Sequence, residues 1–223
     1  MAVSVYQLPL QVRLNDTATF GNFYIGANRQ LVELLQGATE ACAFFWSAEP
    51  AGKSHLLQAV CHVAQPSFYL PLCDWQGLEP AILEGLEQFS IVCLDDVHAI
   101  AGRAEWEIQL FHLFNRIRDS GGHLYIAART APPQLGIKLP DLLSRLSWGP
   151  VFHLQPLDDA QKIQALQMRS IQRGLEMSDE VASYLLNHYP RDMHSLFAIL
   201  DKLDDASLQA QRRLSIPFIK TRL

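Results

Sequence analysis

The stretch Cys42–His55, CAFFWSAEPAGKSH, decides the fold that this chain is expected to adopt. Its apolar start, Ala43 to Trp46, has the composition of a strand and leads into a small-residue loop that ends Ala51-Gly52-Lys53-Ser54. Beyond the loop, apolar residues recur at helical spacing, namely Leu56, Leu57, Val60, Val63 and Ala64. A strand, a loop with G-K-S and a helix, in that order, predict a phosphate-binding loop.

The chemistry of such a loop assigns a role to each residue. Backbone N–H groups at the start of the helix hold phosphate oxygens, and the helix dipole adds attraction for an anion. Lys53 is expected to neutralise the terminal phosphates, and the Ser54 hydroxyl to bind a magnesium ion. The complete pattern has glycine at position 47, where this chain has Ser47, whose Cβ restricts the turn. The G-K-S triplet alone is equally compatible with a lysine at an ordinary helix N-terminus.

A second motif favours the phosphate loop. Residues 91–96, IVCLDD, read as a buried parallel strand with two carboxylates at its C-terminal end. Ligands of open α/β sheets bind at that edge. Asp95 is therefore expected to hold magnesium, directly or through water, and Asp96 to orient or deprotonate a water. The simple alternative is a strand that ends in an Asp-Asp turn.

The order of elements predicts the fold class. Five strand-like runs separated by helices indicate a three-layer α/β domain with a five-stranded parallel sheet. Residues 78–88 are expected to form one of these helices, and residues 139–149 a short amphipathic turn that carries Arg145. After Pro156 the pattern is helical throughout, with an Asp158–Gln161 capping box, and predicts a small all-α bundle. We therefore expect three parts: an N-terminal segment 1–14, an α/β domain 15–156 and a helical domain 157–223.

The composition excludes several classes of protein. The chain has 223 residues, 49% of them hydrophobic, and a net charge of −5, which gives no overall attraction to nucleic acid or to an anionic membrane. Its first residues lack the pattern of a secretory signal, and no apolar run approaches the length of a membrane span. The four cysteines have no C-x-x-C spacing and are expected to be buried free thiols. We expect a cytoplasmic protein without a membrane partner.

Two segments before the phosphate loop leave alternatives open. Residues 20–26 carry Phe23, Tyr24 and Ile25, which either sandwich a nucleotide base or belong to the core, and Asn28 is expected to cap the next helix. Gln7-Leu8-Pro9-Leu10 either anchors the chain in a groove of another protein or packs on its own domain.

Four motifs together resemble the AAA+ ATPases, and within them the family of the bacterial replication initiator DnaA and its regulatory homologues. TFGNFYIGANRQL (19–31) is similar to the nucleotide-adjacent box, AGKSHLLQAV (51–60) to the Walker A loop, and VCLDDVHAIAG (92–102) to the Walker B segment. LPDLLSRLSWG (139–149) resembles the box whose arginine acts as a finger on the nucleotide of a neighbouring subunit, and Arg145 takes that place. The resemblance covers nearly the whole chain.

The resemblance implies an AAA+ P-loop domain with a helical lid that binds ADP or another nucleoside di- or triphosphate with Mg²⁺. It implies a regulator that docks on the DNA sliding clamp through Gln7, Leu8, Pro9 and Leu10 and stimulates ATP hydrolysis by DnaA through Arg145. It implies no direct sequence-specific DNA binding and leaves self-association open. The expected nucleotide ligands are Phe23, Tyr24, Ile25, Gly26, Asn28, Pro50, Ala51, Gly52, Lys53, Ser54, His55, Arg191 and His194.

The chain also departs from the family pattern. Ser47 replaces the first Walker glycine, and Ala128-Arg129 stands where the family carries a polar sensor. The sensor arginine of the lid aligns with His194, one turn after Arg191, and either residue could reach a phosphate. These departures predict weak or no intrinsic ATPase activity. The alternatives are an autonomous AAA+ ATPase of the helicase-loader type and a binding module with a vestigial loop.

Overall fold

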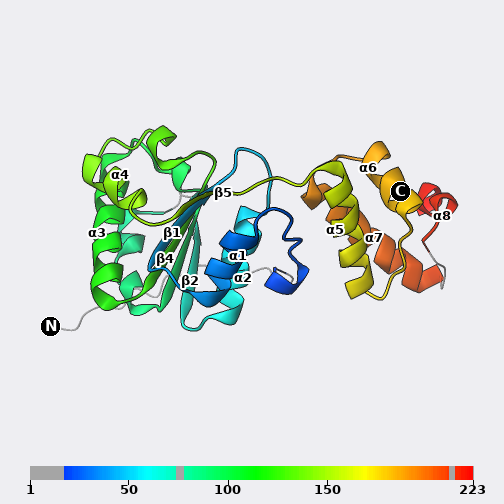
Figure 1. The fold of residues 1–223 in the computed structure, drawn as a ribbon, viewed down its shortest axis with the longest axis horizontal. Coiled ribbons are helices and arrows are strands. Elements are labelled where there is room, and N and C mark those ends of the chain that lie inside the picture. Colours follow the sequence, from blue (N-terminus) through cyan, green and yellow to red (C-terminus); the bar gives the residue numbers. More distant parts are fainter. Residues whose placement is uncertain (1–17, 74–77, 211–213, 223) are drawn as a thin grey trace.

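The structure is a computed structural model, and it describes residues 18–73, 78–210 and 214–222. Its centre is a five-stranded parallel sheet in the order β2-β3-β4-β1-β5. The strands are β1 (Cys42–Trp46), β2 (Ser67–Pro71), β3 (Ile91–Asp95), β4 (His123–Ala128) and β5 (Val151–His153). The predicted three-layer α/β fold with a helical lid is confirmed (Figure 1).

Helices cover both faces of the sheet. One face packs against α1 (Arg29–Gly37) and α2 (Lys53–Val63), and the other against α3 (Ala104–Ser120) and α4 (Pro140–Leu146). Figure 1 shows α3 and α4 on the side of the sheet away from the lid, and α1 and α2 on the side near it. The sheet therefore separates α4 from the part of the domain that approaches the lid.

The lid is a four-helix unit with its own core. It comprises α5 (Asp159–Gln172), α6 (Asp179–His188), α7 (Met193–Ala210) and α8 (Ile216–Arg222). The predicted capping box is present at α5, where the Gln161 N–H donates to Asp158 Oδ1 at 2.8 Å and Gln161 Oε1 accepts from the Asp158 N–H at 3.1 Å. The core of the lid contains Leu166, Leu185, Leu196 and Leu200, all buried.

Several local predictions are wrong. Residues 78–88 form two short 3₁₀ helices, η3 (Pro80–Leu83) and η4 (Leu86–Gln88), because Gly85 between them adopts a left-handed φ of 78°. Val63 is 66% exposed and does not belong to the buried face of α2. The pattern of the lid also predicts a third helix from about Arg191 to Leu203 and a fourth over the remainder up to Pro217. In the structure α7 continues to Ala210, and Pro217 lies inside α8.

The cysteines are only partly as predicted. Cys61 and Cys93 are buried free thiols, whereas Cys42 is half-buried and Cys73 is exposed. Among the described residues no helix is long and apolar enough to cross a bilayer. The predicted N-terminal anchor, residues 7–10, lies outside the described residues.

Candidate functional site

The predicted phosphate loop, residues 47–52, joins the end of β1 to the start of α2. Gly52 has a φ of 92°, a conformation that favours glycine, and a Cβ added there would lie 2.8 Å from Cε2 of Phe23. Ser47 is buried, and its N–H donates to the carbonyl of Ala128 at 3.2 Å. Ser47 is not among the described residues with a left-handed φ, so the loop forms with serine in place of the expected glycine.

Replacing Gly52 with alanine should show how closely this loop is fitted. The left-handed φ alone costs a residue with a Cβ about 1–2 kcal/mol, and the contact with Phe23 should add roughly 1–3 kcal/mol. Gly85→Ala is a matched control, since Gly85 has a φ of 78° but no atom within 4 Å of its added Cβ. Denaturant unfolding should therefore show a larger loss of stability for Gly52→Ala. Equal losses of stability in the two variants would mean that the contact between Phe23 and residue 52 does not restrict the loop.

Lys53, Asp95 and Asp96 converge at the C-terminal edge of the sheet. Lys53 Nζ donates to the carbonyl of Ser47 at 2.8 Å. Burial lowers the pKa of Lys53, while the charges of Asp96 and Asp95 act in the opposite direction and that of Arg129 adds to the lowering. Asp96 has a left-handed φ of 54°, which is strained for a residue other than glycine. Strain of this kind is common where a side chain must be held for function.

The surroundings of Asp95 suit a magnesium ligand. Asp95 is 1% exposed, accepts a hydrogen bond from the Tyr69 hydroxyl at 2.9 Å and bonds to the Ser54 hydroxyl. Burial raises the pKa of Asp95, and the charge of Asp96 raises it further, whereas the bonds from Ser54 and Tyr69 act against the rise. A divalent cation would offset the cost of burying this charge. Ser54 and Asp95 are oxygen ligands already in contact, and Mg²⁺ is commonly held by one or two such ligands together with phosphates.

Sequence reasoning missed two other polar groups at this edge, Tyr69 and His98. Tyr69 orients Asp95 from the neighbouring strand β2. His98 lies 3.8 Å from Asp96, measured from Nδ1 to Oδ1, and burial lowers its pKa. Arg129 follows β4 and acts electrostatically on both Lys53 and His98. Arg129, a cation, therefore belongs to the Ala128-Arg129 pair at which a neutral polar sensor was expected.

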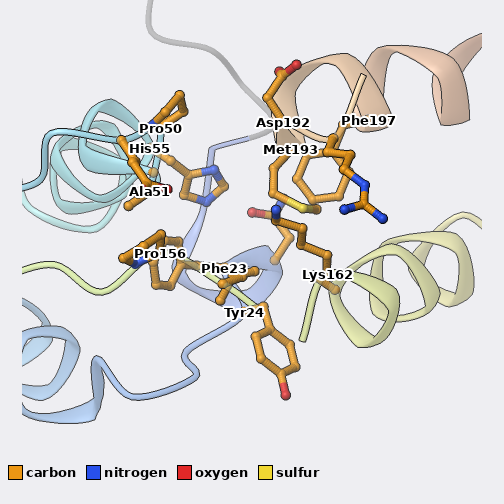
Figure 2. A pocket seen from close by; sticks show the side chains of 16 residues that line it. Phe23, Tyr24, Pro50, Ala51, His55, Pro156, Lys162, Asp192, Met193 and Phe197 are labelled. Carbon is orange, nitrogen blue, oxygen red and sulfur yellow. The ribbon is translucent and has the colours of Figure 1, made fainter. Parts of the chain in front are cut away.

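A cavity of about 290 Å³ lies between the phosphate loop and the lid. Figure 2 shows Phe23 and His55 on the loop side, facing Met193 and Phe197 from the lid. The His55 ring is 5.5 Å from that of Phe23, and its Nε2 is bonded to the carbonyl of Thr19 at 2.8 Å. Burial lowers the pKa of His55, which favours the neutral ring. The walls are thus largely aromatic and apolar, as ligand cavities usually are.

The cavity brings together only some of the predicted ligands. Seven predicted residues line it: Phe23, Tyr24, Pro50, Ala51, Gly52, His55 and Arg191. The other six predicted ligands are not among its lining residues: Ile25, Gly26, Asn28, Lys53, Ser54 and His194. Of the two lid candidates, Arg191 lies at the cavity, where its Nη1 is 3.4 Å from Oδ2 of Asp159. Lys162, Asp192 and Phe197 also line the cavity and were not predicted.

Asn28 has a different role from the one predicted. Its side chain makes no capping hydrogen bond to α1. Instead, Nδ2 donates to the carbonyl of Gln155 at 3.0 Å, and the Gln155 N–H donates to Oδ1 at 2.8 Å. Asn28 is buried and fixes the segment that leads from the sheet into the lid. The aromatic loop is tied to the lid as well, because Gln172 Nε2 donates to the carbonyl of Gly21 at 2.8 Å and the Tyr24 hydroxyl donates to Gln164.

Arg145 lies away from this cavity and is a half-buried residue of α4. It does not line the cavity, and α4 is on the opposite side of the sheet from the lid (Figure 1). A buried carboxylate that was not predicted, Glu107 on α3, fixes the segment just before α4. It accepts hydrogen bonds from the N–H groups of Gly102, Lys138 and Leu139 at 2.6–3.1 Å. Among the ion pairs of the described residues, none joins Arg145 to a carboxylate.

Comparison with known proteins agrees with this architecture. Residues 80–153 match the family described as the bacterial DnaA ATPase domain, and residues 159–223 match the family described as "Hda, lid domain". An uncharacterized protein of Haemophilus influenzae is 45% identical, with 96% of each chain covered. Domain III of Thermotoga maritima DnaA has a similar fold, with a TM-score of 0.74 at 22% identity over 95% of this chain and 97% of that one. AMPPCP-bound DnaA from Aquifex aeolicus gives 0.71 at 24% identity over 87% and 67%.

The fold and the two family matches define the class, an AAA+ protein built like the ATPase domain of DnaA with a helical lid. Within that class, the chain belongs to the Hda-like, DnaA-homologous AAA+ family. It is accordingly a protein related to replication initiation.

Proposed function

We propose that this protein binds a nucleotide in the cavity between the phosphate loop and the lid. Lys53 and the N–H groups at the start of α2 hold the phosphates, and Ser54 with Asp95 holds a magnesium ion that neutralises them. Phe23, His55 and the lid residues Met193 and Phe197 surround the nucleoside. ADP and triphosphates both suit this arrangement. The DnaA homologue solved with AMPPCP supports the proposal, since its fold is similar.

We further propose that the protein is a regulator that stimulates ATP hydrolysis by the initiator DnaA, with Arg145 acting on the initiator's nucleotide. One observation carries this proposal: Arg145 does not line the cavity of its own chain, and its helix α4 lies on the side of the sheet away from the lid (Figure 1). A guanidinium there cannot serve the nucleotide of its own chain, but it is accessible to a neighbouring molecule. The transition state of phosphoryl transfer spreads negative charge over the γ-phosphoryl oxygens, and a desolvated guanidinium stabilises that charge.

The direct experiment measures phosphate release from ATP-loaded initiator, with and without this protein, on DNA that carries the sliding clamp. The proposal expects stimulation that rises with the concentration of this protein and saturates. Absence of stimulation at any concentration would contradict it.

The convergence of Lys53, Asp95 and Asp96 favours a second candidate, an autonomous ATPase of the helicase-loader type. The regulator and the autonomous ATPase differ in the ATP turnover expected of the purified protein without a partner. Steady-state turnover without any partner would support the autonomous ATPase. We expect little turnover, because Ala128 and Arg129 supply no neutral polar sensor at the end of β4.

Clamp docking is proposed from the sequence alone, since residues 7–10 lie outside the described residues. Replacing both Gln7 and Leu8 with alanine should weaken binding to the sliding clamp by about 30-fold or more, because hot-spot side chains of a short anchor contribute roughly 2 kcal/mol or more. The melting temperature should stay unchanged. A pull-down or surface-binding assay that recovers as much clamp with the double variant would refute the anchor.

A further inference from the structure

Trp148, just beyond α4, is an exposed tryptophan with two arginines against it. The residue is 63% exposed, although tryptophan is on average highly buried. The guanidinium carbon of Arg145 lies 5.4 Å from the centre of the indole ring, and that of Arg118 lies 5.8 Å from it. Both distances are within the range of a cation–π interaction, which is strongest with tryptophan.

The backbone at Trp148 is firmly placed. Its N–H donates to the carbonyl of Arg145 at 3.1 Å, which links the two residues through the last turn of α4. At the next residue, Gly149, an added Cβ would lie 2.3 Å from the carbonyl oxygen of Cys42, so the chain passes directly against the start of β1. The indole is also 6.3 Å from the ring of Phe114 on α3. Trp148 thus contacts three neighbouring elements, although most of the residue faces solvent.

The two arginines at this ring differ in their charge partners. Arg118 is paired with Asp119, with Nη2 and Oδ1 3.1 Å apart. Arg145 has no carboxylate partner within the described part of the chain, so the indole is the group that restrains its guanidinium. A long, flexible side chain held in this way keeps its charge available, whereas a salt bridge would neutralise it.

We propose that Trp148 is a positioning residue for Arg145, and that the cation–π contact with the indole holds the guanidinium in the orientation in which it meets the nucleotide of the partner ATPase. The inference rests on the proposed role of Arg145. A small misplacement of a catalytic group can cost about 100-fold in rate. Trp148→Ala should therefore lower the maximal stimulated rate of hydrolysis by roughly 10- to 100-fold, with a smaller effect on the concentration that gives half-maximal stimulation. Trp148→Phe, which keeps an aromatic face, should recover most of the rate.

The test compares four variants by maximal rate and half-maximal concentration. Ile171→Ala is the matched control, because Ile171 is an apolar residue of the lid that is 71% exposed. It should behave like the unaltered protein, and Arg145→Ala should be inactive. If Arg145→Ala is inactive and Trp148→Ala keeps the full maximal rate, only the role of Trp148 is overturned. If Arg145→Ala stimulates normally, the proposed function fails, and the positioning role fails with it.

A second measurement needs no partner. In the NMR spectrum of the full chain, the Nε–Hε signal of Arg145 should be shifted by the ring current of the indole. Trp148→Ala should remove that shift without changing the melting temperature. An Arg145 signal that is the same in both proteins would show that the cation–π contact does not form in solution and would overturn the proposal.

Discussion

Replacing Arg145 with alanine is expected to lower the hydrolysis of the initiator's ATP by roughly 10³- to 10⁵-fold relative to the stimulated rate. Such a factor corresponds to about 4–7 kcal/mol of transition-state stabilisation. It can be this large because the guanidinium contacts charge that develops only during phosphoryl transfer. The measurement is single-turnover phosphate release from initiator loaded with ATP.

The fold and the nucleotide affinity of this variant should be unchanged, because Arg145 is at the surface of α4 and does not line the cavity. Arg29→Ala is the matched control, since Arg29 is an exposed arginine on α1, paired with Glu33 at 3.7 Å. The control should stimulate as the unaltered protein does. Stimulation by Arg145→Ala that persists near the level of the control would end the proposed role of the finger.

The second large effect is expected for Lys53→Ala, which should weaken nucleotide binding by about 30- to 4,000-fold. Removing one partner of a buried, hydrogen-bonded charge pair costs roughly 2–5 kcal/mol. Lys53 is at the start of α2, where its Nζ is 2.8 Å from the carbonyl of Ser47 in the loop that would surround the phosphates. Isothermal titration with ADP and with a non-hydrolysable triphosphate would measure the loss.

Lys202→Ala is the control for this experiment, because Lys202 is an exposed lysine on α7 in the lid and lies outside the predicted phosphate loop. Nucleotide should raise the melting temperature of the unaltered protein and of Lys202→Ala, but not that of Lys53→Ala. If neither the unaltered protein nor the control binds nucleotide, the loop is vestigial and the protein is a binding module of another kind.

Much of the fold could be predicted because it depends on local patterns. The apolar run of β3 followed by Asp95 and Asp96 predicts a buried strand with carboxylates at its end, and that is what forms. The capping box at Asp158 likewise depends on residues three positions apart. Patterns of this kind determine structure through neighbours in the chain, so one sequence is sufficient to find them.

The predictions that failed depend on competition with distant groups. Asn28 is a suitable N-cap, but two backbone groups of Gln155 satisfy its amide instead. Gly85 permits a helix as well as a turn, and the turn divides the predicted helix over residues 78–88. Neither choice can be read from the local sequence.

The walls of the cavity could be predicted only in part for the same reason. Phe23 and Gly52 belong to recognisable motifs, whereas Lys162 and Phe197 reach the cavity only because the lid folds back towards the phosphate loop. Tyr69 and Glu107 belong to no recognisable motif. Tyr69 donates a hydrogen bond to Asp95, and Glu107 accepts hydrogen bonds from the loop before α4. Supporting residues of this kind become visible only with the structure.

The most direct test of whether this protein acts on a nucleotide held by another molecule uses two labels. The initiator is loaded with ATP that carries one isotope in its γ-phosphate, this protein is loaded with nucleotide that carries another, and phosphate release is followed after mixing on clamp-loaded DNA. We predict a rapid release of the initiator's label that is lost with Arg145→Ala, while the label of this protein stays bound. Release of this protein's own label, with the initiator's ATP left intact, would contradict the account.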